Sequence, residues 1–268
     1  IRNVLDYRGV LAPHTGQPFT EAMLMGIAGG IAFGYFYFNY EGQDPQVNIL
    51  TRNTFNNYGW DAITRRLGLT QDLIHSTTPD RARQKLVATL EEGEAPIVWA
   101  DIFRLGYETS EFGDGMWMTV PVVVARYDRE AGDATLADRS RRPIRVSTDR
   151  LDAARSRVKK DKHRLVVLDG PTDDQLPSAV VEGIRECVQL YTEKPPKGSA
   201  QSFGIKGLRR WSQMLTSQSG KTSWETLYPT GRAMFAALTT AFKYSMLYCK
   251  DETMSAERAV FADFVDEA

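Results

Sequence analysis

The stretch at residues 23–40, MLMGIAGGIAFGYFYFNY, decides how the fold of this chain is interpreted. Thr20 precedes it as a helix start signal, and Gly29 and Gly30 end the apolar helical part. Residues 31–38 are mostly β-branched or aromatic, which is typical of a strand buried on both faces. The stretch therefore predicts a helix that crosses directly into a buried strand.

The glycines of this stretch match neither a phosphate-binding loop nor a membrane span. Gly26, Gly29 and Gly30 are not spaced as G-x-G-x-x-G, and a helix followed by a strand reverses the order of a dinucleotide-binding loop. The run is also shorter than the ~20 residues of a membrane helix. A second candidate, GKT at residues 220–222, has Leu215 where a P-loop needs its first glycine. We interpret the opening stretch as buried scaffold.

The rest of the chain divides into two parts by its residue pattern. Up to about residue 170, helical patterns precede a series of strands, which are predicted at residues 95–103, 116–128, 134–140 and 163–170. Beyond that point the pattern is almost wholly helical, with Pro-, Gly- and Ser-rich connections. We predict an α+β domain at residues 1–170 and a mainly helical domain at residues 171–268.

The composition excludes a strong overall attraction to polyanions. The 268 residues are 42% hydrophobic and 25% charged with a net charge of −1, so neither nucleic acid nor a membrane is an expected partner. Cys187 and Cys249 lack C-x-x-C spacing and predict no disulfide framework, which fits the reducing cytoplasm. The longest membrane candidate, residues 234–249, is interrupted by Lys243 and is too short to span a bilayer.

The sequence predicts no metal site and no cofactor. His14, His75 and His163 lie in separate segments, with no i+4 partner and no acid or cysteine at metal-ligand spacing. No G-x-S-x-G nucleophile motif is present either. Any chemistry must therefore come from residues that no general motif identifies.

Two further segments each allow two interpretations. The basic run RSRVKKDKHR at residues 155–164 is either a solvated connection or a docking surface for an acidic partner. The residues that would make that contact are Arg155, Arg157, Lys159 and Lys160. An apolar helical face is either intramolecular core or the seam of a homodimer. That face consists of Phe235, Leu238, Phe242, Met246 and Cys249.

Several spaced motifs together resemble a known family. The segments IRNVLDYRG, FTEAMLMGIAGGIAFGYFYF, YGWDAITRRLG, LVATLEEGEAPIVWADIFRLGYE, VPVVVARYD and ATLADRS resemble the N-terminal domain family of butirosin biosynthesis protein H. The later segments FGIKGLRRWSQML and FADFVDEA resemble the helical domain that usually follows it. The resemblance covers nearly the whole chain.

This resemblance implies a papain-like cysteine-peptidase fold that is used for acyl transfer in natural-product pathways. The founding member moves an aminoacyl group from the phosphopantetheine thioester of a carrier protein to an amine of an aminoglycoside. A cysteine thiolate attacks the thioester, a histidine carries protons, and an acid orients the histidine. The implied partners are an acyl substrate, a small-molecule acyl acceptor and a carrier protein.

The family pattern is degenerate in this chain. The nucleophilic cysteine is expected upstream of Ile1, and the histidine position holds Val120, with Thr119 before it. Asp138 matches the position of the orienting acid, and Asp101 matches a position near the cleft. The segment LGYE at residues 105–108 also matches the family near the cleft.

These matches define the predicted site and two possible functions. The catalytic candidates, which can carry a proton, are Asp138, Glu108 and Tyr107. The substrate-binding candidates are Asp101, Gly29, Gly30, Thr119 and Val120. One function is an enzyme that acts on an acyl or aminoacyl substrate by acyl transfer, amide formation or cyclisation. The alternative is a catalytically inactive relative that binds a carrier protein or pathway partner as a scaffold.

Overall fold

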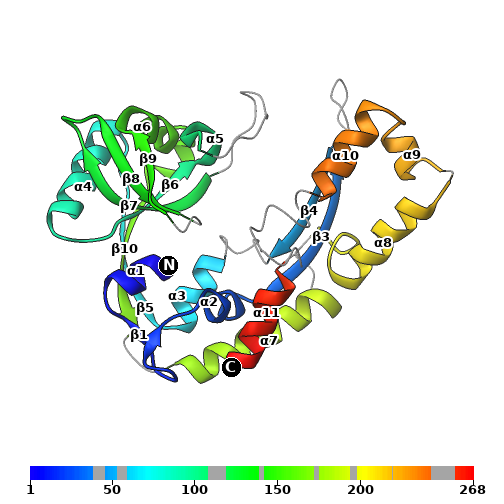
Figure 1. Ribbon diagram of the computed structural model, residues 1–268, viewed down its shortest axis with the longest axis horizontal. Coiled ribbons are helices and arrows are strands. Elements are labelled where there is room, and N and C mark those ends of the chain that lie inside the picture. The colour runs from blue at the N-terminus through cyan, green and yellow to red at the C-terminus, as the bar shows by residue number, and fades with distance from the viewer. Residues whose placement is uncertain are drawn as a thin grey trace. The chain divides into compact units, whose positions relative to one another are not determined.

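The chain forms two compact units, each made of two separate stretches of sequence (Figure 1). The computed structural model describes residues 1–38, 46–52, 59–107, 119–138, 142–171, 175–193, 198–218, 220–242 and 257–268. Unit 1 comprises Ile1–Pro18 and Leu69–Thr172, and unit 2 comprises Phe19–Gly68 and Asp173–Ala268. The chain therefore passes from unit 1 to unit 2, returns to unit 1 and ends in unit 2.

Unit 1 is built on a six-stranded antiparallel sheet with the strand order β5-β10-β6-β7-β8-β9. The strands are β5 (Leu69–Ile74), β6 (Ile97–Asp101), β7 (Thr119–Asp128), β8 (Asp133–Ala137), β9 (Ile144–Ser147) and β10 (Leu165–Pro171). The helices are α1 (Arg2–Tyr7), α4 (Pro79–Glu91), α5 (Ile102–Leu105), α6 (Thr148–Ser156) and the 3-10 turn η2 (Lys159–Asp161). A small ribbon pairs β1 (Leu11–Ala12) with β2 (Gln17–Pro18).

The core of unit 1 lies between this sheet and helices α4, α5 and α6. Side chains alternate between the two faces of a strand, and Val120, Val122 and Val124 of β7 all enter the same buried cluster. Leu86 of α4 and Leu151 of α6 belong to that cluster from the helical side. Each fully buried aliphatic side chain contributes roughly 1.5–3 kcal/mol, so this layer strongly stabilises unit 1.

Unit 2 combines a two-stranded antiparallel ribbon with helices. The ribbon pairs β3 (Ile31–Phe38) with β4 (Gln46–Arg52). The helices are α2 (Glu21–Ile27), α3 (Trp60–Arg66), α7 (Leu176–Thr192), α8 (Gly204–Thr216), α9 (Trp224–Leu227), α10 (Arg232–Phe242) and α11 (Arg258–Glu267). Tyr35 of β3 stacks on Trp211 and accepts a hydrogen bond of 2.8 Å from the Trp224 indole. The ribbon is therefore joined to α8 and α9 through aromatic rings.

The helix-to-strand stretch of the sequence is buried in unit 2. Thr20 caps α2 by accepting a hydrogen bond of 2.9 Å from the Met23 N–H. Gly29 and Gly30 have φ values of 101° and 69° where the chain turns from α2 into β3. A Cβ atom on Gly30 would lie 2.3 Å from the ring of Phe261 in α11. Backbone conformation and close packing therefore both require glycine at position 30.

A close approach between α2 and α7 also depends on glycine. A Cβ atom on Gly183 of α7 would lie 2.2 Å from the carbonyl oxygen of Gly26 and 3.0 Å from the Cα atom of Ile27. The ring of Phe264 in α11 occupies the space where a side chain on Gly26 would project. In Figure 1, α7 and α11 accordingly lie beside α2. The three helices pack around positions that hold no side chain.

The structure confirms the predicted α+β class. The helix and strand predicted around Gly29 are observed as α2 and β3, but β3 pairs with β4 in unit 2 and is not part of the six-stranded sheet. The sequence analysis did not predict β4. The compact units also divide the chain differently from the predicted domains, because Phe19–Gly68 packs with Asp173–Ala268. The division at residues 1–170 and 171–268 stays a prediction.

Gly183→Ala should destabilise unit 2. Alanine in place of glycine ordinarily stabilises a helix by about 0.5–1 kcal/mol. At this position we expect a loss of about 1–3 kcal/mol, because the new methyl group meets backbone atoms of α2 that cannot rotate away. Urea denaturation measures the free energy of unfolding.

The matched control is Val181→Ala, on the exposed side of the same helix. This change should alter the free energy of unfolding by less than about 0.5 kcal/mol. A neutral or stabilising Gly183→Ala would contradict the close approach of α2 and α7.

Candidate functional site

Two of the predicted catalytic residues meet in unit 1. The Tyr107 hydroxyl donates a hydrogen bond of 2.8 Å to the Asp138 carboxylate. Tyr107 follows Gly106, whose φ of 72° ends α5 and turns the chain. Asp138 follows the last residue of β8. The end of α5 therefore delivers a phenol to the end of β8, although the two residues are 31 positions apart.

The end of β6 and the start of β7 lie side by side in the same sheet. Asp101 closes β6 and is paired with Thr119, the first residue of β7. The Asp101 residue is only 1% exposed, and its carboxylate caps α5 by accepting a hydrogen bond of 3.3 Å from the Phe103 N–H. The Nε atom of Arg157 lies 4.0 Å from the same carboxylate. Asp101 thus has structural bonds that hold it in the interior.

Val120, at the position expected for the family histidine, belongs to the apolar core. Its side chain lies in the same buried cluster as that of Val122. Ala137 is paired with Val123, so continuing this register by one residue sets Asp138 beside Val122 on the core face of the sheet. Position 120 is then a diagonal neighbour of Asp138, within reach of a long side chain. Valine puts no proton-carrying group there.

Two of the predicted substrate-binding residues, Gly29 and Gly30, belong to unit 2 and not to unit 1. Gly29 and Gly30 are buried in unit 2, and the contact between Gly30 and Phe261 gives this turn a structural role. Glu108 lies outside the described residues. Of the three catalytic candidates, the structure therefore brings together Tyr107 and Asp138.

The basic run begins inside the protein, which corrects the prediction for Arg155. This residue is 3% exposed, and its guanidinium donates hydrogen bonds to the carbonyl oxygens of Ala82 and His163. Burial lowers the pKa of Arg155 to about 10. A guanidinium held in this way cannot contact a partner at the surface.

The other members of the predicted docking surface lie nearer to solvent. Arg157 is a third exposed and pairs with Asp101. Lys159 and Lys160 are exposed on η2, which follows α6. The docking prediction therefore rests on these three residues.

A second tyrosine–aspartate pair in unit 1 offers an internal comparison. The Tyr127 hydroxyl donates a hydrogen bond of 2.9 Å to Asp152, which also accepts one of 2.8 Å from the Nε atom of Arg83. Burial and the bond to Asp152 raise the pKa of Tyr127. This pair joins β7, α6 and α4, and none of its residues matches a family site position. It is a structural counterpart of the Tyr107–Asp138 pair.

Among the described residues, no side-chain cluster provides a metal site or an activated thiol. No group of three or more His, Cys, Asp or Glu residues there could hold a metal ion. Cys187 is buried, and its thiol lies 3.3 Å from the Ile31 carbonyl oxygen. Burial raises the pKa of this thiol to about 11, which disfavours the nucleophilic thiolate. Within the same parts of the chain, no helix is long and apolar enough to cross a membrane.

The predicted apolar helical face is described in part. Phe235, Leu238 and Phe242 are exposed along α10, so these side chains are not buried in unit 2. Met246 and Cys249 lie outside the described residues. The homodimer stays a prediction.

Comparison with known protein families identifies the family of this chain. A family model described as butirosin biosynthesis protein H, N-terminal, matches residues 1–139. The chain belongs to this family. The region matched by the butirosin biosynthesis protein H family contains Tyr107, Val120 and Asp138, so the tyrosine–aspartate pair lies within the family domain. No curated protein sequence matches the chain.

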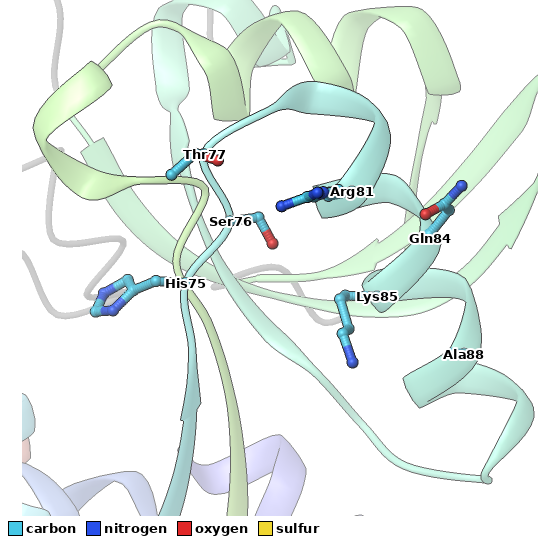
Figure 2. Close-up of a pocket in the computed structure, with 7 residues that line it drawn as sticks. All are labelled: His75, Ser76, Thr77, Arg81, Gln84, Lys85 and Ala88. Atoms are coloured by element: carbon cyan, nitrogen blue, oxygen red, sulfur yellow. The ribbon is translucent and has the colours of Figure 1, made fainter.

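Unit 1 has a hollow beside α4 that was not predicted from the sequence. Its lining comes from the chain that follows β5 and from one face of α4 (Figure 2). The lining residues are His75, Ser76, Thr77, Arg81, Gln84, Lys85 and Ala88. The last four follow helical i, i+3, i+4, i+7 spacing, which is a signal that the sequence contains. The fold of residues 75–77 against that face could not be inferred from the spacing.

The stability of the protein should fall as the pH drops through the range in which unfolded histidine titrates. Burial, and then the nearby charge of Arg155, lowers the pKa of His163 below its usual 6.5. Below pH 6.5 the unfolded chain binds more protons at this position than the folded chain, so protonation favours unfolding. The stability present above pH 6.5 is lost progressively as the pH falls toward the folded pKa.

His163→Asn should make this pH dependence shallower, because the titrating group is removed. Asparagine tolerates the positive φ of 49° at this position. Urea denaturation between about pH 7.5 and pH 5.5 measures the slope for both proteins. Equal slopes would show that His163 does not contribute to it.

Proposed function

We propose that this member of the butirosin biosynthesis protein H family acts in natural-product biosynthesis on an acyl or aminoacyl substrate. The reaction is acyl transfer, amide formation or cyclisation, in a papain-like fold with a degenerate catalytic set. Family membership links the chain to antibiotic biosynthesis in general. The single observation that carries the chemistry is the hydrogen bond from Tyr107 to Asp138 within the matched region.

The tyrosine–aspartate pair supplies proton-transfer chemistry without a histidine. When an amine attacks a thioester, the C–N bond forms, the C–S bond breaks, and the proton lost by the amine must reach the departing sulfur. A phenol that is hydrogen bonded to a carboxylate can donate a proton to the leaving group or stabilise negative charge on the carbonyl oxygen. We assign the Asp138 carboxylate as the group that takes the proton lost by the amine and the Tyr107 hydroxyl as the group that gives its proton to the departing sulfur. Transfer of the proton from Asp138 to the Tyr107 oxygen along their hydrogen bond then restores both groups.

A scaffold function is the second candidate, and Val120 favours it. A buried valine at the histidine position removes the group that would activate a nucleophile. In that case the Tyr107–Asp138 bond only joins α5 to β8, as the Tyr127–Asp152 bond joins β7 to α6. The chain would then bind a carrier protein or pathway partner without turnover.

The proposed partners are a small-molecule acyl acceptor and an acyl donor carried on a phosphopantetheine carrier protein. An acidic carrier would be attracted to the exposed cations of η2 and to Arg157. The attraction would act over about 8–10 Å at physiological ionic strength and would weaken as salt is added.

Removing either member of the catalytic pair should slow turnover. Tyr107→Phe and Asp138→Asn should each lower the rate of acyl transfer by about 100-fold, because each removes the proton donor or its acceptor. The double variant should be at most a few fold slower than either single variant, because the two residues act as a unit. Mass spectrometry of the acyl product, formed from an acyl-loaded carrier protein and an amine, measures the rates.

The matched control is Tyr127→Phe, which removes a hydroxyl from the same type of bond at Asp152. Its rate should stay within about twofold of the unmodified protein, after correction for any loss of folded protein. Intact mass of the full-length protein after mixing with the acyl carrier detects a covalent acyl adduct. Carrier binding with neither turnover nor adduct would support the scaffold and exclude the enzyme for that substrate.

The docking proposal predicts a loss of salt-dependent carrier binding. Reversing the charge at Arg157, Lys159 and Lys160 should weaken carrier affinity by about tenfold and flatten its dependence on salt. The same number of reversals at Arg129, Arg145 and Arg185, also in exposed positions, is the control. Equal loss in both triple variants would indicate a general charge effect and reject this docking site.

A further inference from the structure

An open hollow of about 660 Å³ lies in unit 1 between residues 75–77 and one face of α4. Figure 2 shows Ser76 and Arg81 directed toward one another across it, with Lys85 on the next turn of the helix. The hollow is within the size range of small-molecule sites. It contains neither Tyr107 nor Asp138, so it is a different place from the proposed catalytic pair.

Ser76 presents its hydroxyl to this hollow. The residue is 7% exposed, and its side chain projects into the space beside Arg81 (Figure 2). Its backbone N–H is already used, because it donates to the Lys162 carbonyl oxygen at 2.8 Å. Among the residues that the structure describes, no hydrogen bond is found for the Ser76 hydroxyl. A hydroxyl without a protein partner that faces an open hollow is available to a ligand.

The hollow is cationic. Arg81 and Lys85 are four residues apart on the same face of α4, and neither makes an ion pair with any residue in the described ranges. None of the seven lining residues is acidic. Asp80, the acid next to Arg81 in the sequence, pairs with Arg83 at 3.1 Å. The two cations therefore have no carboxylate within the lining to neutralise them.

Residues around the hollow add positive charge and further hydrogen-bond donors. The bond between Ser76 and Lys162 brings the exposed end of the basic run beside residues 75–77. The hollow follows the flank of α4 from Arg81 to Ala88. Thr77 and Gln84 add a hydroxyl and an amide to the lining.

We propose that this hollow binds the phosphate group of a small polar phosphate ester. The Arg81 guanidinium and the Lys85 ammonium pair with the phosphate oxygens, and the Ser76 hydroxyl donates a hydrogen bond. The volume leaves room for the organic part of the ester, which His75, Thr77 and Gln84 contact. Six of the seven lining residues have polar side chains, which can hydrogen bond to hydroxyl groups of the organic part.

The positive charge of the hollow excludes cationic ligands from it. A positively charged amine acceptor of the acyl-transfer reaction would be repelled by Arg81 and Lys85. The phosphate site therefore does not depend on the proposed function.

The test is an NMR titration of the whole chain with inorganic phosphate, glucose 6-phosphate and glucose, at constant ionic strength. Binding is followed through the amide signals of Ser76 and Thr77. We expect saturable shifts with both phosphates and none with glucose. The double variant Arg81→Gln with Lys85→Gln should weaken the affinity for inorganic phosphate and for glucose 6-phosphate at least about tenfold. Ser76→Ala should weaken both affinities at least about threefold.

The matched control is Arg129→Gln with Arg145→Gln, which removes two exposed cations elsewhere on unit 1. The affinities of this control for inorganic phosphate and glucose 6-phosphate should stay within about twofold of those of the unmodified protein. Thermal unfolding checks that every variant is folded. Shifts that do not saturate, or an equal loss in the control, would overturn the site. Binding of inorganic phosphate without glucose 6-phosphate would overturn the assignment to an ester.

Discussion

The burial of one face of β7 is the constraint on which unit 1 depends. Val120, Val122 and Val124 alternate with residues of the opposite face and enter a single apolar layer beneath α4, α5 and α6. Ile102 and Leu105 of α5 are buried in this layer, and Gly106 then ends the helix, so that Tyr107 meets Asp138. The layer also encloses position 120 within apolar side chains. The same packing that assembles the proposed catalytic pair therefore buries a valine, which carries no proton, at that position.

The two tyrosine–aspartate pairs of unit 1 show that a hydrogen bond alone does not identify a function. Their donor, acceptor and length are nearly the same, at 2.8 and 2.9 Å. The Asp152 carboxylate also accepts a hydrogen bond from Arg83 and so joins helix α4 to the sheet. The other, Asp138, lies within the region that the family model matches, and we predict that it is the family acid. The functional argument comes from the place of the pair in the fold, not from the strength of the bond.

Some basic residues of unit 1 are buried and others are exposed. The net charge of the chain does not reveal this difference. Arg155 is held inside by two carbonyl oxygens, whereas Lys159 and Lys160 of the same run are exposed. Arg81 and Lys85 face a hollow without an acidic lining residue. A chain with a net charge of −1 can thus carry a local cationic surface suited to anions.

The sequence by itself determined the α+β class, the cap and bounds of α2 and β3 and the family. It also predicts Tyr107, Val120 and Asp138 as site positions. These follow from local periodicity, start and stop signals and motif spacing. Only the tertiary structure decided that β3 pairs with β4 in unit 2, that Tyr107 reaches Asp138, that Arg155 is buried and that Ser76 faces Arg81. These results depend on strand pairing and on contacts between residues distant in sequence, and a periodic pattern does not specify which partner each face will meet.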